Sequence, residues 1–228
     1  MSQSPPDPID SAPSLAAAAL DHLLVDRLIV GFETGGRAYY GQGRPLWPGG
    51  DSGVAIGCGY DLGYHSAQDL RRDWSAYLPS VALDQLAGVC GLTGVAARAH
   101  VPALTAIKIP YDAALTQFYD RVLPVWTDRT LRAFPGSAAL PPACLTVLVS
   151  LTYNRGPSFK ARIKNGRDTR SEMRSIRGAV EAGNWPAVPA LIRAMKTLWQ
   201  GPETPFNLRG RREAEAKAWE AAMKGAKS

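Results

Sequence analysis

A glycine-rich segment near the start of the chain limits the possible folds more than any other feature. Between residues 37 and 64, eight glycines and two prolines separate short apolar pieces such as Ala38–Tyr40 and Val54–Ile56. Glycine is costly inside a helix and proline lacks a backbone N–H, so we expect no long helix in this segment. The segment therefore predicts a small β-hairpin lobe with tight turns over about residues 35–64.

Helical periodicity surrounds this lobe on both sides. The expected helices cover residues 15–33, 66–78, 79–91, 111–134, 140–154, 168–181, 185–199 and 208–223. Pro124 should bend or divide the fourth of them. We therefore expect an α+β, mostly α protein with a disordered leader over residues 1–13. A single domain follows over 14–228, with a β lobe at about 35–64 and a larger helical lobe at about 65–228.

The charge is concentrated in the C-terminal third of the chain. Residues 155–228 hold 16 Lys and Arg against 7 Asp and Glu, although the whole chain carries a net charge of only +6. Such a region should face an anionic polymer or surface. The charges fall on several helical faces. The sequence also has no aromatic-rich RNA-binding strand and no Cys/His spacing of a zinc finger, so nucleic acid is not an expected partner.

The apolar stretch over residues 15–32 is interrupted by Asp21, His22, Asp26 and Arg27, so no membrane span is expected. No basic region precedes this stretch, and we expect synthesis in the cytoplasm without a signal peptide. The three cysteines and three histidines show no metal-ligand spacing. We expect neither a metal site nor a cofactor.

Glu33 is the first candidate catalytic residue. It falls in the last turn of an apolar helix, where the negative end of the helix dipole and apolar neighbours disfavour a charged carboxylate. A carboxyl group that keeps its proton near neutral pH can act as a general acid. The alternative is that Glu33 only forms a salt bridge with Arg37.

A second carboxylate should come from the glycine-rich lobe. Asp51 and Asp61 are the candidates, although an aspartate among glycines often serves only its own turn. Glycines let the backbone approach a bulky ligand closely, and Tyr40, Trp47 and Tyr60 offer flat faces for sugar rings.

Three segments in order resemble the phage-type lysozymes (glycoside hydrolase family 24). The first places Glu33 at the end of a helix before a glycine-rich hairpin that ends in V-A-I-G-C-G-Y-D-L-G. The second, at 145–156, reads LTVLVSLTYNRG, and the third, at 208–219, reads LRGRREAEAKAW. The G-Y-D-L-G ending is most similar to pesticin-like lysozyme domains. The resemblance covers about residues 20–223 and implies a lysozyme-like fold.

The resemblance also implies roles for individual residues. Glu33 takes the place of the proton donor, and Asp61, or Asp51 as the less favoured choice, takes that of the second acid. Arg209 or Arg212 would be a structural residue near the site. The residues implied to bind substrate, or to stand at substrate-binding positions, are Tyr40, Trp47, Ser52, Ala55, Tyr60 and Asn154. Ala55 departs from the family, which has a threonine there that helps to hold the attacking water; Ser52 is a nearby hydroxyl.

The resemblance implies a muramidase that cuts the β-1,4 bond between N-acetylmuramic acid and N-acetylglucosamine in peptidoglycan. The alternatives are a lysozyme-fold protein that binds cell-wall glycan without cleaving it, and a lytic transglycosylase. The basic third would hold the protein against anionic wall polymers. The protein would act on the cell wall or periplasm, as an endolysin after holin release or as an antibacterial effector injected by a secretion system. An effector would imply an immunity protein.

Overall fold

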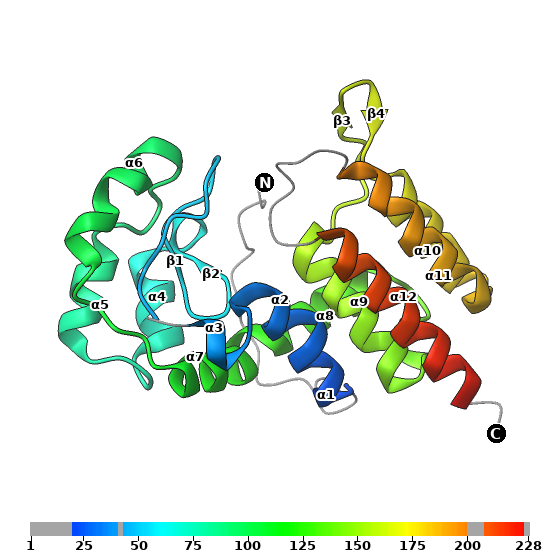
Figure 1. The fold of residues 1–228 in the computed structure, drawn as a ribbon, viewed down its shortest axis with the longest axis horizontal. Coiled ribbons are helices and arrows are strands. Elements are labelled where there is room, and N and C mark those ends of the chain that lie inside the picture. The colour runs from blue at the N-terminus through cyan, green and yellow to red at the C-terminus, as the bar shows by residue number, and fades with distance from the viewer. Residues whose placement is uncertain (1–19, 41–42, 200–207, 226–228) are drawn as a thin grey trace. The chain divides into compact units, whose positions relative to one another are not determined.

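The computed structural model describes residues 20–40, 43–199 and 208–225 (Figure 1). It is mostly helical with two small antiparallel hairpins, which confirms the α+β, mostly α class. The chain divides into two compact units: unit 1 is described over residues 33–40 and 43–123, and unit 2 over residues 20–32, 124–199 and 208–225. The leader expected over residues 1–13 lies outside the described residues.

The first helical stretch runs through three consecutive elements and ends at two glycines. These elements are α1 (His22–Val25), the π-helical η2 (Asp26–Val30) and α2 (Gly31–Thr34). Gly35 and Gly36 then take φ angles of 73° and 79°, which favour glycine and end the helix. The predicted end near Glu33 is confirmed, whereas the predicted start at Leu15 lies outside the described residues.

Unit 1 contains one hairpin and a set of short helices. Its elements after α2 are α3 (Arg37–Tyr40), β1 (Ala55–Ile56), β2 (Tyr60–Asp61), η3 (Leu62–Tyr64), α4 (Ala67–Trp74), α5 (Ser80–Ala87), α6 (Gly94–His100), η4 (Val101–Leu104), α7 (Tyr111–Gln117) and η5 (Phe118–Val122). The strand expected around Val54–Ile56 is confirmed.

The interpretation of Ala38–Tyr40 as a strand is wrong, because these residues form the helical turn α3. The backbone N–H of Tyr40 donates to the Gly36 carbonyl at 2.9 Å, which closes the turn. Arg37, at its start, pairs with Asp112, and its guanidinium lies 4.7 Å from the centroid of the Tyr111 ring. These contacts with α7 favour the turn over an extended segment.

The hairpin β1–β2 packs one of its faces into the core of unit 1. Ile56 pairs with Tyr60, and both side chains are buried, with the Tyr60 ring 5.7 Å from Trp74 of α4. A Cβ atom on Gly57 would lie 2.6 Å from the Trp74 ring, so glycine permits this close approach. A hairpin this small needs α4 to complete its core. Residues 65–123 belong to the same compact unit as the hairpin.

Unit 2 is built around one buried helix. Its elements after η2 are α8 (Leu123–Ala133), η6 (Ser137–Ala139), α9 (Pro142–Arg155), β3 (Ile163–Lys164), β4 (Arg167–Asp168), α10 (Ser171–Glu181), η7 (Trp185–Ala187), α11 (Val188–Ala194), η8 (Met195–Leu198) and α12 (Leu208–Gly225). The helix expected over residues 140–154 is present as α9, and ten of its consecutive residues, from Cys144 to Tyr153, are buried. In Figure 1, α12 runs beside α9 and α11, and both contact it.

The helical stretch from Tyr111 to Ala133 changes character next to Pro124. Proline supplies no N–H for the carbonyl one turn earlier, and the π-helical η5 ends just before this residue. The division between the two units also falls between Leu123 and Pro124.

The hairpin β3–β4 was not expected from the sequence. Its turn places Asn165 at φ 51° and Gly166 at φ 72°, as a two-residue hairpin turn requires. The Asn-Gly pair was the sequence signal that could have identified it.

Candidate functional site

Glu33 lies in the last turn of α2 and its side chain is half-buried. The next residue, Thr34, accepts the backbone N–H of Gly36 at its Oγ1 at 3.0 Å, which fixes the chain as it leaves the helix. Arg37 pairs with Asp112. The carboxyl group thus stands at the end of a helix and at the start of unit 1, directly before the glycine-rich segment.

Asp61 is held by backbone amides. Its Oδ1 accepts the N–H groups of Gly53 and Gly63, each at 2.9 Å, and its Oδ2 lies 3.2 Å from the same Gly53 nitrogen. Burial raises the pKa of Asp61, although the two amides act in the opposite direction. The carboxyl group is therefore rigidly oriented, and one of its oxygens is used to tie the loop before β1 to the turn after β2.

Asp61 and Ala55 lie directly opposite each other across the hairpin. Since paired residues project to the same face, Ala55 and Asp61 share the face opposite to Ile56 and Tyr60, with Cβ atoms about 4.5–5.5 Å apart. Leu46 forms an antiparallel bridge with Ala55 and extends this row. The exposed fraction of the Leu46 side chain is 52%, so this face is open to solvent at that end.

Two glycines of the hairpin lobe, Gly53 and Gly63, lie very close to each other. A Cβ atom on Gly53 would lie 2.2 Å from the Gly63 nitrogen and 2.4 Å from Asp61 Oδ1. We expected the glycines of this lobe to let the backbone approach a ligand. At these two positions, the small size of glycine is already needed for the backbone packing inside unit 1.

Asp51, Ser52 and Trp47 lie in the loop that precedes β1. Asp51 is exposed, and its carbonyl accepts the hydroxyl of Tyr64 at 3.2 Å. Trp47 is half-buried and donates its Nε1–H to the Ser52 carbonyl at 3.0 Å, while the Arg98 guanidinium lies 5.5 Å from its ring centroid. The loop keeps an exposed carboxylate and a partly exposed indole close together in the chain.

The two candidate tyrosines have different surroundings. Tyr60 is buried, its hydroxyl donates to Asp73 Oδ2 at 2.9 Å, and the His65 ring stacks on it with centroids 4.0 Å apart. Tyr60 therefore belongs to the core and offers no open face to a sugar. Tyr40 is half-buried, and its ring meets Tyr111 edge-on at 5.2 Å. Burial raises the pKa of its hydroxyl.

The remaining candidates, Asn154, Arg209 and Arg212, belong to unit 2. Asn154 lies in the last turn of α9, and its Oδ1 is buried without a hydrogen-bond partner among the described residues. Arg209 is exposed, whereas Arg212 is fully buried. Of the two arginines expected to be structural, Arg212 has the buried environment of a structural residue.

A buried ionic cluster holds Arg212 in place. Arg212 Nε and Nη2 lie 2.6 and 2.7 Å from the two carboxylate oxygens of Glu215, and Arg211 Nε lies 3.4 Å from Glu215 Oε1. Ser150 of α9 donates its hydroxyl to the same Oε1 at 2.6 Å. Arg211, Glu215 and Ser150 were not among the residues expected at the site. The spacing of the two arginines three and four residues before Glu215 was the available signal.

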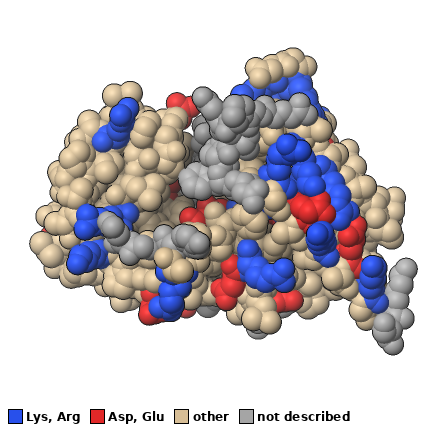
Figure 2. All heavy atoms as spheres, viewed as in Figure 1, with Lys and Arg blue, Asp and Glu red and all other residues tan. Residues whose placement is uncertain are grey.

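Much of the positive charge in the C-terminal third is paired within unit 2. Glu213 pairs with Arg193 and Lys196, and Arg193 also pairs with Glu220. Figure 2 shows blue Lys and Arg atoms around the β3–β4 hairpin and along the nearby helices, with red carboxylates between them. These ion pairs reduce the positive charge that is available to an anionic polymer. Attraction to such a polymer would therefore depend on Lys and Arg side chains that form no ion pair within the protein.

No helix among the described residues is long and apolar enough to span a membrane. In the same part of the chain, no three His, Cys, Asp or Glu side chains gather as a metal site would require.

Two variants of Asp61 separate its structural contribution from its charge. We expect Asp61→Ala to lower the free energy of unfolding by about 1–3 kcal/mol, because the Gly53 and Gly63 amides lose their acceptor in a partly buried loop. Asp61→Asn keeps an acceptor oxygen and should lose much less. Urea denaturation of both variants measures the difference; equal losses would show that the negative charge, and not the acceptor, stabilises the loop.

The comparison with protein families matches one part of the chain. A family model described as a domain of unknown function (DUF8812) matches residues 28–120. This range covers nearly all of unit 1, including Glu33, Asp51 and Asp61. No curated protein matches the chain.

Proposed function

We propose that this protein is a lysozyme-type peptidoglycan hydrolase that cuts the β-1,4 bond between N-acetylmuramic acid and N-acetylglucosamine. The observation that supports this most is the cross-strand pair of Ala55 and Asp61. By the resemblance, Ala55 stands at the position of the water-holding residue and Asp61 at that of the second acid. They lie in the same compact unit as Glu33, which ends a helix as the proton donor of such an enzyme would.

In this proposal Glu33 is the general acid. It donates its proton to the glycosidic oxygen as the bond to the anomeric carbon breaks, so the leaving sugar departs as an alcohol. The second carboxylate stabilises the positive charge that develops at the anomeric carbon, or accepts a proton from the attacking water. An inverting site separates its two carboxyl groups by about 6.5–9.5 Å, and inversion is what the resemblance implies.

Asp61 remains our first choice for the second acid, and Asp51 is the alternative. Two amides orient Asp61 on the outward face of the hairpin, and such preorganisation suits a catalytic carboxylate. Asp51 is more exposed and lies in a turn. Peptidoglycan cleavage by Asp61→Asn and by Asp51→Asn distinguishes the two candidates, because each asparagine keeps the shape of the side chain and removes its charge.

A second candidate function is glycan binding without cleavage. Ala55 supports it, because a methyl group cannot hold the attacking water as the threonine hydroxyl of the family would. Ser52 offers a hydroxyl in the neighbouring loop, but its carbonyl and not its hydroxyl makes the contact with Trp47. Loss of one positioning hydrogen bond lowers a rate and need not abolish it, so hydrolysis remains the first proposal.

The proposal carries expectations about where the protein acts. The substrate lies in the bacterial cell wall or periplasm, which an endolysin reaches after holin release and an injected effector reaches through a secretion system. Anionic wall polymers would attract the basic third, and an effector would be neutralised by an immunity protein.

The test is incubation of the purified protein with isolated peptidoglycan, followed by mass analysis of the released muropeptides. Products with a reducing-end N-acetylmuramic acid support hydrolysis. Products with 1,6-anhydro ends would instead identify a lytic transglycosylase. Absence of products, with the protein retained on the glycan in a sedimentation assay, would favour the binding function.

A further inference from the structure

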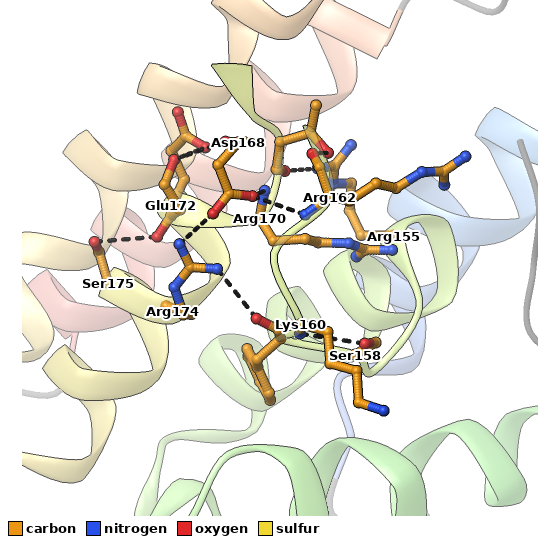
Figure 3. A network of polar contacts seen from close by, with 12 residues as sticks. Arg155, Ser158, Lys160, Arg162, Asp168, Arg170, Glu172, Arg174 and Ser175 are labelled. Atoms are coloured by element: carbon orange, nitrogen blue, oxygen red, sulfur yellow. Dashed lines mark hydrogen bonds and ion pairs between the residues drawn. The ribbon is translucent and has the colours of Figure 1, made fainter. Parts of the chain in front are cut away.

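Three arginines meet at the base of the β3–β4 hairpin in unit 2. We name Arg155, Arg162 and Arg170 the arginine cluster (Figure 3). Arg155 ends α9, Arg162 precedes β3, and Arg170 stands between β4 and α10. Both the backbone N–H and the Oγ1 of Thr169 donate to the Arg162 carbonyl, at 2.9 and 3.0 Å, and Arg155 donates to the Thr169 carbonyl. These bonds bring residues distant in sequence together.

The side chain of Arg170 extends towards the start of the loop that follows α9. Its Nη2 would lie 3.9 Å from a Cβ atom on Gly156, the residue directly after Arg155. Figure 3 shows Arg155, Arg162 and Arg170 on one side of the polar network, with Glu172 and Arg174 on the other. The three cations of the arginine cluster are therefore neighbours.

The carboxylates of this region already have other partners. Asp168 accepts the backbone N–H groups of Arg162 and Arg170 at 3.0 and 2.9 Å, and its other oxygen pairs with Arg174. Glu172 pairs with Arg167 and accepts the Ser171 hydroxyl at 3.0 Å. Among the described residues, no carboxylate forms an ion pair with a guanidinium of the arginine cluster.

Two nitrogens of the cluster are buried and still available as donors. Arg155 Nε and Arg170 Nη1 are inaccessible to solvent and have no hydrogen-bond partner in the described part of the chain. A buried donor without a partner costs free energy, and a buried cation without a counter-ion costs more. The cluster is therefore incomplete with respect to both hydrogen bonding and charge.

The electrostatic balance points in the same direction. Burial, together with the charges of Arg170 and Arg212, lowers the pKa of Arg155 to about 10, although Glu172 acts in the opposite direction. Burial also lowers the pKa of Arg170, with a contribution from Arg162. Arginine does not lose its proton in proteins, so a negative group would relieve the repulsion.

We propose that the arginine cluster binds an oxyanion, either a carboxylate or a phosphoryl group. Guanidinium groups offer forked donors that match the paired oxygens of both groups, and each bond so formed would be charge-assisted. The proposal depends on unit 2 alone and does not require the muramidase function. A protein that failed to cleave peptidoglycan could still bind the anion.

The test measures the melting temperature of the full chain in a chloride buffer of constant ionic strength while inorganic phosphate, or acetate in a parallel series, replaces chloride. We expect one of the two anions to raise the melting temperature of the wild type saturably, by roughly 3–6 °C at ten times its Kd. The anion that does so identifies the group bound. Isothermal calorimetry of the wild type with the same anion should show a stoichiometry of about one.

Two variants locate the effect. Arg155→Gln and Arg170→Gln should abolish the anion-dependent shift, and Arg170→Gln should melt no lower than the wild type in the chloride buffer, because it removes an uncompensated cation. Arg177→Gln is the matched control, since Arg177 lies on α10 and pairs with Glu181; it should keep the full shift.

Two outcomes would overturn the proposal. The first is a shift of the same size in Arg170→Gln. The second is the absence of any saturable binding of phosphate or acetate by the wild type.

Discussion

Replacing Glu33 with glutamine is expected to reduce the release of muropeptides from peptidoglycan by about 10²–10⁴-fold, the usual contribution of a general acid. The amide has nearly the same shape as the carboxyl group, but it has no proton that it can transfer to the glycosidic oxygen. The side chain is half-buried in the last turn of α2, so the substitution should leave the fold intact. The rate is measured from the mass-resolved products of isolated peptidoglycan.

Glu181→Gln is the matched control for Glu33→Gln. Glu181 also ends a helix, α10, but it is exposed and pairs with Arg177. This variant should cleave at the wild-type rate, and both variants should melt near the wild type. If Glu33→Gln kept most of the wild-type rate, Glu33 would not be the proton donor and the proposed mechanism would fail.

The second large effect concerns stability. Glu215→Gln should lower the free energy of unfolding of unit 2 by about 3–5 kcal/mol, because it removes a buried negative charge that pairs with two buried guanidinium groups. Arg211, Arg212 and Glu215 are each at most 1% exposed, so water cannot replace the lost carboxylate. Urea denaturation followed by circular dichroism measures the shift of the midpoint.

The control for Glu215→Gln lies two residues away in the same helix. Glu213 pairs with Arg193 and Lys196 at the surface of unit 2, where solvent screens the charges. Glu213→Gln should therefore leave the unfolding midpoint nearly unchanged. Equal shifts for the two variants would show that the cluster around Glu215 is not the main ionic contribution to the stability of unit 2.

Periodicity and capping predicted most of the helices. The helix expected from residue 66 is present as α4, and a capping box formed by Ser66 and Asp69 stabilises its start. The helix expected over residues 140–154 is α9, the buried helix of unit 2. These features depend on residues close together in sequence, so they could be inferred from the sequence alone.

Features that depend on distant contacts were not predictable in the same way. Ala38–Tyr40 has a strand-like composition, yet contacts with α7 favour a helical turn. The packing of Tyr60 of the hairpin against Trp74 of α4, within unit 1, is not shown by sequence periodicity.

The candidate site was predicted in part. The position of Glu33 at a helix end and the strand around Ala55 follow from local patterns. The burial of Tyr60 beneath His65, and the use of Asp61 as an acceptor for two glycine amides, depend on how the hairpin folds back on itself. An aspartate in G-Y-D-L-G looks the same in sequence whether it orients a loop, a water molecule or both.

The division of the chain also has a consequence for the order in which the protein folds during synthesis. The described residues of unit 1 all precede α9 in the sequence, so the ribosome releases them before α9 is made. Unit 2 cannot complete its core until α12 emerges, because Trp219 and the buried arginines come from that helix. Nascent chains therefore pass through a stage in which unit 1 is complete while the apolar surface of α9 still lacks its cover.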